Sequence, residues 1–235
     1  MIYITGDTHG DFKRVADFCF RVGTSKNDVL IILGDSGLNY YDPSRSKYLK
    51  MFVQELPITI FCIHGNHEMR PEALPSYKTK EWRGGTVYYE DGFPSLLFAK
   101  DGSVFDFDGV STAVIGGAYS IDKLRRIVLG LGWWNYEQPS QEIKDRFVSA
   151  LEARNWNVDV ILSHTCPLKY EPVEVFLPGF NQQDVDRTTE RFLDSIEDRA
   201  SYKRWYCGHF HTNKRIDKMS FLFDDILAFA DNLPY

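Results

Sequence analysis

The chain has 235 residues, of which 43% are hydrophobic and 15% aromatic, which is enough for a sizeable core in a single domain over residues 1–235. The formal net charge of −6 and the pI near 5.5 give no basic surplus of the kind that binds nucleic acid stably or docks on an anionic membrane. A small phosphorylated ligand stays compatible with this charge, because bound metal ions can reverse the local sign.

The four cysteines are widely spaced and form no C-x-x-C pair, which indicates reduced thiols rather than a disulfide framework. Cys166 and Cys207 lie close in sequence to histidines and are possible metal ligands, but we assign both to packing as small apolar side chains. No signal peptide is recognisable after Met1, and no apolar stretch is long enough to span a bilayer. We therefore expect a cytoplasmic protein without membrane association, and its oligomeric state stays open.

The first 65 residues alternate between apolar strands and amphipathic helices. Residues 29–33 (VLIIL) are continuously apolar, which is typical of a strand buried on both faces, and a similar run lies on each side of them. Between these runs, residues 11–22 and 44–56 carry apolar residues at helical spacing, with Asp11 as the expected N-cap of the first helix. This alternation predicts parallel strands joined by right-handed crossovers.

The middle of the chain, residues 85–117, changes to short strands separated by D-G and G-G turns, the pattern of antiparallel hairpins. Two more helices are expected, one from about Ser140 and one over residues 185–196. Further strands are expected at residues 158–164 and 204–209, followed by a closing hairpin at 215–225. These elements favour a four-layer αββα sandwich, with two mixed β-sheets packed face to face, helices outside and a site at the carboxyl ends of the strands.

Short polar segments follow the apolar strands and carry the candidate metal ligands. These residues are Asp7 and His9, Asp35, Asn66 and His67, His164, and His209 and His211. In an extended segment, residues two apart project to the same face, so His209 and His211 can approach one point. A lone H-x-H pair more often marks ordinary core or surface histidines, but this many oxygen and nitrogen donors exceeds the need of one tetrahedral zinc. The set suits two divalent ions of five- or six-fold coordination, with Asp35 as the natural bridging carboxylate.

Five sequence motifs then occur in order between residues 6 and 211: GDTHG, GD, GNHE, a single histidine and GHFH. They resemble the D-x-H, G-D, G-N-H-[DE], H and G-H-x-H pattern of the calcineurin-like metallophosphoesterase superfamily. Each motif alone is a weak signal, whereas five in order at strand ends are specific. The resemblance covers nearly the whole chain and implies hydrolysis of a phosphate ester at a binuclear metal centre.

Carried over position by position, the resemblance implies a role for each candidate. Asp7, His9 and His211 would bind one ion, Asn66, His164 and His209 would bind the other, and Asp35 would bridge them. A hydroxide held between the ions would attack phosphorus in line, and His67, a non-ligand, would protonate the leaving group. The donors tolerate Mn, Fe, Zn or Ni without selecting one. Glycines precede the ligand positions, where the backbone must turn sharply or approach the metals closely: Gly6, Gly34, Gly65 and Gly208.

The second motif departs from the Ser/Thr phosphatase branch of the superfamily, which extends it to G-D-x-x-D-R-G. Leu38 and Asn39 stand where that branch has an aspartate that orients the catalytic histidine and an arginine that grips phosphate, which argues against protein-phosphatase activity. Trp133 and Trp134 can roof the site and stack on an aromatic group, or pack as ordinary hydrophobic side chains. The candidates for a replacement cation, each with a solvated surface charge as the alternative, are Arg45, Arg70, Lys123, Arg125 and Arg126.

The expected function is phosphomonoester hydrolysis, with a phosphorylated small molecule or nucleotide as the substrate. Hydrolysis of a phosphodiester, a nucleotide or a dinucleotide stays open, because the same dimetal centre serves these reactions. A non-catalytic module that binds a phosphorylated ligand is the alternative from a different class. Such a module would be expected to lose metal ligands or His67, and all eight positions are present.

Overall fold

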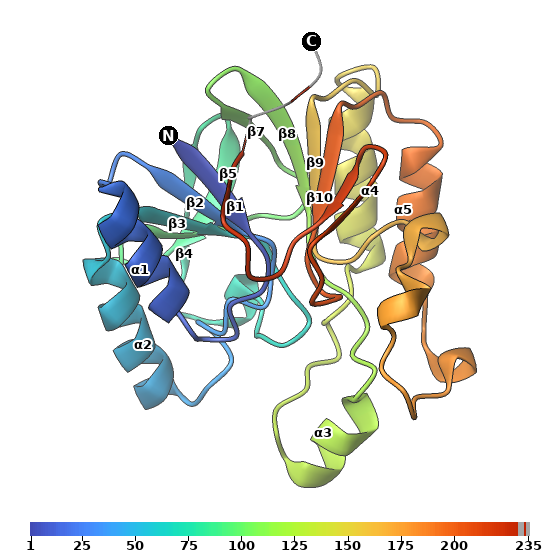
Figure 1. Ribbon diagram of the computed structural model, residues 1–235, viewed down its shortest axis with the longest axis horizontal. Helices are drawn as coiled ribbons and strands as arrows, with labels where there is room; N and C mark the ends of the chain where they lie inside the picture. Colours follow the sequence, from blue (N-terminus) through green and yellow to red (C-terminus); the bar gives the residue numbers. More distant parts are fainter. Residues whose placement is uncertain (230–232, 234–235) are drawn as a thin grey trace.

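The computed structural model describes residues 1–229 and residue 233, and its first β-sheet has seven strands (Figure 1). They are β1 (Ile2–Thr5), β2 (Val29–Ile32), β3 (Thr59–Cys62), β4 (Lys78–Trp82), β5 (Gly85–Tyr89), β6 (Leu96–Ala99) and β13 (Leu227–Ala228). Their order across the sheet is β13–β1–β2–β3–β6–β5–β4. The predicted parallel pairing of β1, β2 and β3 is confirmed, and every residue of β2 is buried, as expected for a strand covered on both faces.

The second sheet has six strands in the order β11–β12–β10–β9–β8–β7. They are β7 (Val104–Phe107), β8 (Val110–Ile115), β9 (Val160–Ser163), β10 (Arg204–Cys207), β11 (Lys214–Ile216) and β12 (Met219–Phe221). Strands β8, β9, β10 and β12 are parallel neighbours. The hairpins predicted within residues 85–117 are confirmed as the antiparallel pairs β5–β6 and β7–β8, and the predicted closing hairpin is confirmed as β11–β12. β4, which pairs antiparallel with β5, was not predicted. Both sheets are therefore mixed.

Helices α1 (Lys13–Val22) and α2 (Pro43–Glu55) cover the outer face of the first sheet, and α4 (Gln141–Glu152) and α5 (Thr188–Glu197) cover that of the second (Figure 1). Apolar side chains fill the space between the two sheets and the space under each helix pair, which confirms the predicted four-layer αββα sandwich. Short 3-10 turns lie at Pro71–Ala73, Leu168–Tyr170, Val173–Val175 and Gln182–Asp184. Within the described residues, no helix is long and apolar enough to cross a membrane.

Three helix details differ from the sequence predictions. α1 begins at Lys13 with Phe12 as its N-cap, so the predicted cap Asp11 is wrong by one residue, although its Oδ1 accepts a hydrogen bond from Lys13 N. α5 begins at Thr188 rather than at residue 185. A further helix, α3 (Lys123–Leu129), was not predicted, because seven residues are too few to reveal a helical period. In Figure 1, α3 extends away from the sandwich on a lobe of its own.

The loops after the parallel strands of the two sheets meet between the sheets. The Nδ1 of His164, after β9, donates to the carbonyl of Leu33, after β2, at 2.7 Å. The backbone N–H of His209, after β10, donates to Oδ1 of Asp7, after β1, at 3.0 Å. These contacts join the carboxyl ends of the strands, which is where open α/β sheets bind ligands.

Candidate metal centre

The structure brings together all eight residues that the sequence singled out. Asp7 and His9 follow β1, Asp35 follows β2, Asn66 and His67 follow β3, His164 follows β9, and His209 and His211 follow β10. Loops from five strands therefore contribute to one cluster between the sheets, and no single segment holds it.

Asp7, His9 and His211 form the first group of donors. The Nε2 atoms of His9 and His211 lie 2.9 Å apart, and Asp7 Oδ2 lies 3.2 Å from His211 Nε2 and 3.7 Å from His9 Nε2. Asp7 Oδ2 is buried and makes no hydrogen bond of good geometry within the described part of the chain. A buried carboxylate oxygen is seldom left in this state. Three donor atoms that face one point instead fit a divalent cation.

His164, Asn66 and His209 form the second group. Because His164 Nδ1 donates to a backbone carbonyl, its Nε2 is left to face the cluster, 2.8 Å from Asn66 Oδ1. In the neutral ring, Nε2 and Oδ1 are two lone-pair atoms that face each other, an arrangement that a shared cation would satisfy. The ring of His209 lies edge to face with that of His164, with 5.0 Å between the ring centroids.

Asp35 lies between the two groups. Its Oδ2 is 3.6 Å from His164 Nε2 and 3.7 Å from His67 Nδ1, and its Oδ1 accepts a hydrogen bond from His67 N at 2.7 Å. Among the described residues, three sets of side chains have ligand atoms that all lie within 4.8 Å of one another: Asp7–His9–His211, His9–Asp35–His67 and Asp7–Asp35–His164. Asp35 belongs to two of these sets, which is the position that a bridging carboxylate requires.

Burial and neighbouring charges set the protonation of the cluster. Burial lowers the pKa of His9 and lowers the pKa of His209 to about 3, so both rings are neutral and can offer a lone pair. Burial raises the pKa of Asp35, but nearby His164 and His67 outweigh this effect and hold it well below the usual range. Burial also disfavours charged His164, whereas Asp35 raises its pKa to about 9. An ion that binds His164 must therefore displace a proton.

The loop after β10 is not the extended segment that the sequence predicts, and that prediction is wrong. β10 ends at Cys207, and His209 and His211 have left-handed backbone with φ of 65° and 47°. His9 and Asp35 are also left-handed, with φ of 47° and 46°. Such conformations are uncommon outside glycine, cost on the order of 1–3 kcal/mol each, and cluster at functional sites where the surrounding fold enforces them. The same ligand set is thus presented by strained loops rather than by a strand.

Two glycines let the backbone pass close to the carboxylates. A Cβ on Gly65 would lie 2.0 Å from Asp35 Oδ1, and a Cβ on Gly208 would lie 2.3 Å from Asp7 Oδ1. Both distances are far below van der Waals contact, so any side chain at these positions would displace a predicted ligand. At these two glycines the backbone thus passes close to predicted ligands, and its close approach to the metals themselves stays a prediction.

The sequence matches a family model described as calcineurin-like phosphoesterase over residues 1–213. The chain therefore belongs to the calcineurin-like phosphoesterase family. Members of this family are in general metal-dependent phosphoester hydrolases, and the Asp and His groups of this chain are able to hold metal. No curated protein is detectably similar to the chain in sequence.

Two of the solved structures that match this chain differ in what they show about its fold. The crystal structure of TT1561 of Thermus thermophilus aligns with a TM-score of 0.52 and 13% identity, over 94% of this chain and 87% of that one. At this identity the likeness shows a shared fold. The protein of unknown function AQ665 from Aquifex aeolicus aligns at 14% identity over 73% of this chain and 81% of that one, with a TM-score of 0.30 that does not establish a shared fold.

Glu68, the last residue of GNHE, joins two loops of the donor cluster. It is buried, and its Oε2 accepts a hydrogen bond from Ser36 Oγ at 2.6 Å. Its Oε1 accepts from the backbone N–H groups of Ser36 at 3.3 Å and Gly65 at 3.4 Å. Glu68 therefore ties the loop that carries Asp35 to the loop that carries Asn66. Sequence reasoning did not assign it a role, although its place in the motif was the available signal.

His67 lies at the edge of the donor cluster. While its Nδ1 faces Asp35, its Nε2 lies 3.5 Å from Oδ1 of Asp122, on the segment between β8 and α3. Asp122 was not predicted as a site residue. Burial raises its pKa, but His67 and Arg126 outweigh this effect and keep the pKa below the usual value, so it is a carboxylate.

Ser120, from the same segment, is a second residue that sequence reasoning missed. Its Oγ accepts a hydrogen bond from Asn66 Nδ2 at 2.8 Å, which leaves Asn66 Oδ1 directed at His164. Ser120 and Asp122 follow β8, so the rule that polar residues gather after apolar strands applies to them. They lie several residues beyond the strand end, in a region where only basic side chains were predicted as site residues.

The buried members of the predicted cation set are held by carboxylates. Arg70 Nη1 lies 2.5 Å from Asp101 Oδ2, and its Nε donates to the Tyr136 carbonyl at 2.8 Å. Arg126 Nε donates to both carboxylate oxygens of Asp122 at 3.0 Å. Both guanidinium groups therefore have structural roles in this protein, and a role in gripping phosphate stays a prediction.

The other predicted cations are more exposed. Lys123 Nζ lies 4.3 Å from the Trp133 ring centroid, and Arg45 stacks at 3.7 Å over the ring of a neighbouring tyrosine. Arg125 is exposed on α3. Trp133 and Trp134 are half-buried in the loop after α3, and the Nε1 of Trp133 donates to a buried glutamate. Their contact with a substrate stays a prediction.

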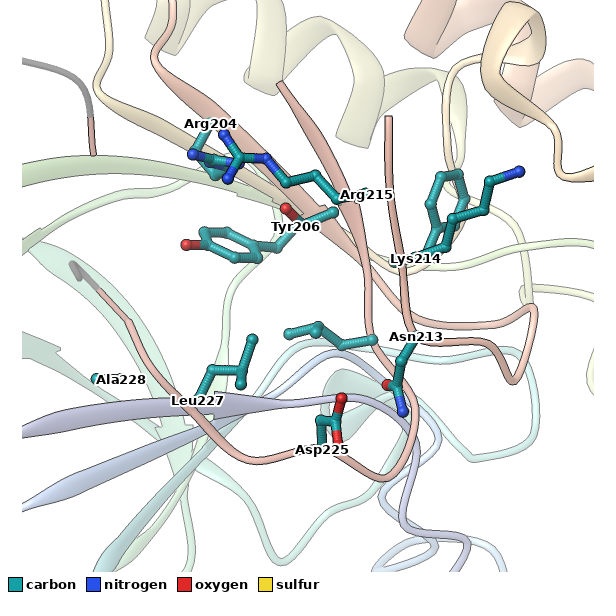
Figure 2. Close-up of a pocket in the computed structure, with 11 residues that line it drawn as sticks. Arg204, Tyr206, Asn213, Lys214, Arg215, Asp225, Leu227 and Ala228 are labelled. Atoms are coloured by element: carbon teal, nitrogen blue, oxygen red, sulfur yellow. The ribbon is translucent and has the colours of Figure 1, made fainter. Parts of the chain in front are cut away.

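Two surface pockets of about 450 and 560 Å³ are lined by none of the eight residues of the cluster. The first opens between the two sheets, with Arg204 and Tyr206 of β10 on one side and Leu227 and Ala228 of β13 on the other (Figure 2). Its lining contains no histidine and one carboxylate, Asp225. The groups of side chains that could hold a metal therefore lie in the donor cluster and not in these two pockets.

Proposed function

We propose that this protein hydrolyses a phosphate monoester with the help of two divalent ions. The observation that carries the proposal is the convergence of seven oxygen and nitrogen donors between the sheets, with a further histidine at their edge. Membership of the calcineurin-like phosphoesterase family supports metal-dependent ester hydrolysis in general. The proposed substrate is a phosphorylated small molecule or nucleotide, and Mn²⁺ is the first ion to test.

The first ion is proposed to bind Asp7, His9 and His211. Their ligand atoms lie within 4.8 Å of one another, and the buried Asp7 Oδ2 lacks a hydrogen bond of good geometry to any described residue. Asp35 is proposed to bridge to the second ion. The ligand atoms of Asp7, Asp35 and His164 also lie within 4.8 Å of one another, so Asp35 links a residue of each group.

The second ion is proposed to bind Asn66, His164 and His209. His164 Nε2 and Asn66 Oδ1 face each other at 2.8 Å, and the neutral His209 ring packs against His164. His67 competes for a ligand role, because it forms a set with His9 and Asp35. We assign it to the non-ligand position, since its Nε2 faces a second carboxylate outside the donor set.

Two divalent ions held by these residues would activate water as a nucleophile and neutralise the phosphate oxygens. The chain's own residues hold the components of the reaction in place. The Leu33 carbonyl fixes the ring of His164, and the backbone N–H of His67 fixes Asp35. His67 is proposed to donate a proton from Nδ1, the edge that faces Asp35, to the departing oxygen, which contributes about 10²–10⁴ in rate.

Metal analysis and a substrate panel test the proposal. The purified protein is expected to bind two ions per chain, to lose hydrolysis on exhaustive chelation and to regain it with Mn²⁺. The panel contains monoesters, diesters, cyclic nucleotides and dinucleoside polyphosphates. Preference for a diester or dinucleotide would replace the monoester proposal. Two bound ions without hydrolysis of any ester would favour the non-catalytic module, and one tightly bound ion with full activity would contradict the bridging role of Asp35.

His67→Ala separates proton donation from metal binding. The variant is expected to keep both ions and to lose about 10²–10⁴ in rate on esters with poor leaving groups. The loss shrinks on a nitrophenyl ester, whose leaving group needs little protonation. Equal losses on both esters would rule out proton donation, and the loss of an ion would make His67 a ligand.

A further inference from the structure

The loop that follows Asp35 offers no carboxylate to His67. At the third position after Asp35 stands Leu38, whose side chain is buried in the apolar cluster beneath α1 and α2. The carboxylate that faces His67 Nε2 comes instead from Asp122, in the segment between β8 and α3 of the other sheet, at 3.5 Å. Two chain segments from opposite sheets thus meet at the edge of the donor cluster.

Asp122 does not cap α3 with its side chain, although its position suggests that role. It occupies the N-cap of α3, but its side chain accepts no hydrogen bond from the backbone of that helix. Arg126 Nε, one turn later, donates to both of its oxygens at 3.0 Å, which fixes the plane of the carboxylate. Its Oδ1 also faces His67. In this geometry Asp122 takes the place of a third group that orients a catalytic imidazole, here that of His67. Such hydrogen bonds are often long until substrate binds.

The lobe that carries Asp122 is fastened to the site at several points. Ser120 Oγ accepts from Asn66 Nδ2 at 2.8 Å, and Arg126 Nη1 donates to the Gly132 carbonyl at 2.9 Å. From the first sheet, the Tyr40 hydroxyl donates to the carbonyl of Leu131 at 2.6 Å. The first and third of these bonds join the lobe to the loops after β3 and β2, and the second holds the lobe together internally, so Asp122 is held beside the ring of His67.

We propose that Asp122 is a positioning residue that accepts a hydrogen bond from Nε2–H of His67 and so turns Nδ1 toward the leaving group. The inference rests on the proposed hydrolysis of a phosphate ester. The proton on Nε2 stays on the ring, and the one transferred comes from Nδ1 and is replaced from water. Arg126 keeps the carboxylate charged and in plane. The competing role is structural, in which the Asp122–Arg126 pair only stabilises α3 by the small amount usual for pairs four residues apart.

A double-mutant cycle on the metal-loaded full-length chain separates these roles. Asp122→Ala, His67→Ala and the double variant are assayed on phenyl phosphate and 4-nitrophenyl phosphate, with metal content measured for each. Asp122→Ala is expected to keep both ions and to lower kcat on phenyl phosphate by about 10- to 100-fold, part of what a positioned acid contributes. The loss is smaller on 4-nitrophenyl phosphate. In the His67→Ala background, Asp122→Ala has no further effect, because it acts through that ring.

Two further variants serve as a substitute and as a control in this experiment. Asp122→Asn keeps the size of the side chain and serves in the cycle if Asp122→Ala fails to fold. Asp17→Ala removes an exposed aspartate on α1 and controls for the change in net charge. An equal loss from Asp122→Ala with and without His67, or the loss of an ion, would overturn the positioning role while leaving hydrolysis intact. Absence of hydrolysis by the loaded wild-type protein would overturn the proposed function itself, and Asp122 with it.

Discussion

Glu68 offers a test of how the site is held together, independent of its chemistry. The side chain is buried and accepts three hydrogen bonds, from Ser36 Oγ, Ser36 N and Gly65 N. Burial and the charge of Asp35 raise the pKa of Glu68 to about 7. A neutral amide is therefore a close substitute for this carboxyl group, whereas a methyl group is not.

The structure sets the expected size of the effect. Glu68→Ala leaves two buried backbone N–H groups without an acceptor, and each costs about 1–3 kcal/mol, so the free energy of unfolding falls by about 2–6 kcal/mol. Glu68→Gln keeps the carbonyl oxygen for both N–H groups, and Ser36 Oγ can accept from the new amide as it already accepts from Leu38 N. Its loss is therefore expected to stay below about 1.5 kcal/mol.

Urea denaturation of the two variants and the wild type measures these losses. Glu142→Ala is a matched control, because Glu142 is 88% exposed and its removal should change stability by less than about 0.5 kcal/mol. The metal content of Glu68→Gln should equal that of the wild type. Equal losses for the alanine and glutamine variants, or a loss for Glu68→Ala no larger than that of the control, would refute the hydrogen-bond argument.

Three further predictions concern other parts of the protein. Asp35→Asn should abolish binding of both ions by elemental analysis, while Cys166→Ala, a change in an apolar cluster, should leave metal content intact; metal loss from the cysteine variant would mean that the ligand list is wrong. Ser120→Ala frees the amide of Asn66 and should weaken the second ion about 10- to 100-fold in a competition titration, and unchanged affinity would remove this supporting role. Burial raises the pKa of Glu190 from 4.5 to about 7, so folding stability falls as pH rises from about 4.5 to about 7 and levels off above. In denaturation experiments, Glu190→Gln should therefore be more stable than wild type by up to about 3 kcal/mol at pH 8 and differ little at pH 4.5, and a pH-independent difference would contradict this.

The architecture could be predicted from the sequence because its signals are local. Continuous apolar runs such as Val29–Ile32 indicate strands buried on both faces, and D-G and G-G turns indicate hairpins. Parallel topology then places all strand ends on one edge, so motif residues far apart in sequence, such as Asp7 and His164, were predicted to meet. This needed no knowledge of the angle or distance between the sheets.

Only the tertiary structure decided how these residues are presented and what supports them. His209 and His211 lie on left-handed backbone, because contacts from Asp7 and the packing of two sheets override the extended conformation that their spacing suggests. Asp122 reaches His67 because the segment after β8 of the second sheet lies against the loop after β3 of the first. Residue type and spacing in the sequence determine which side chains lie at the site, whereas the packing of one sheet on the other determines which of them are in contact.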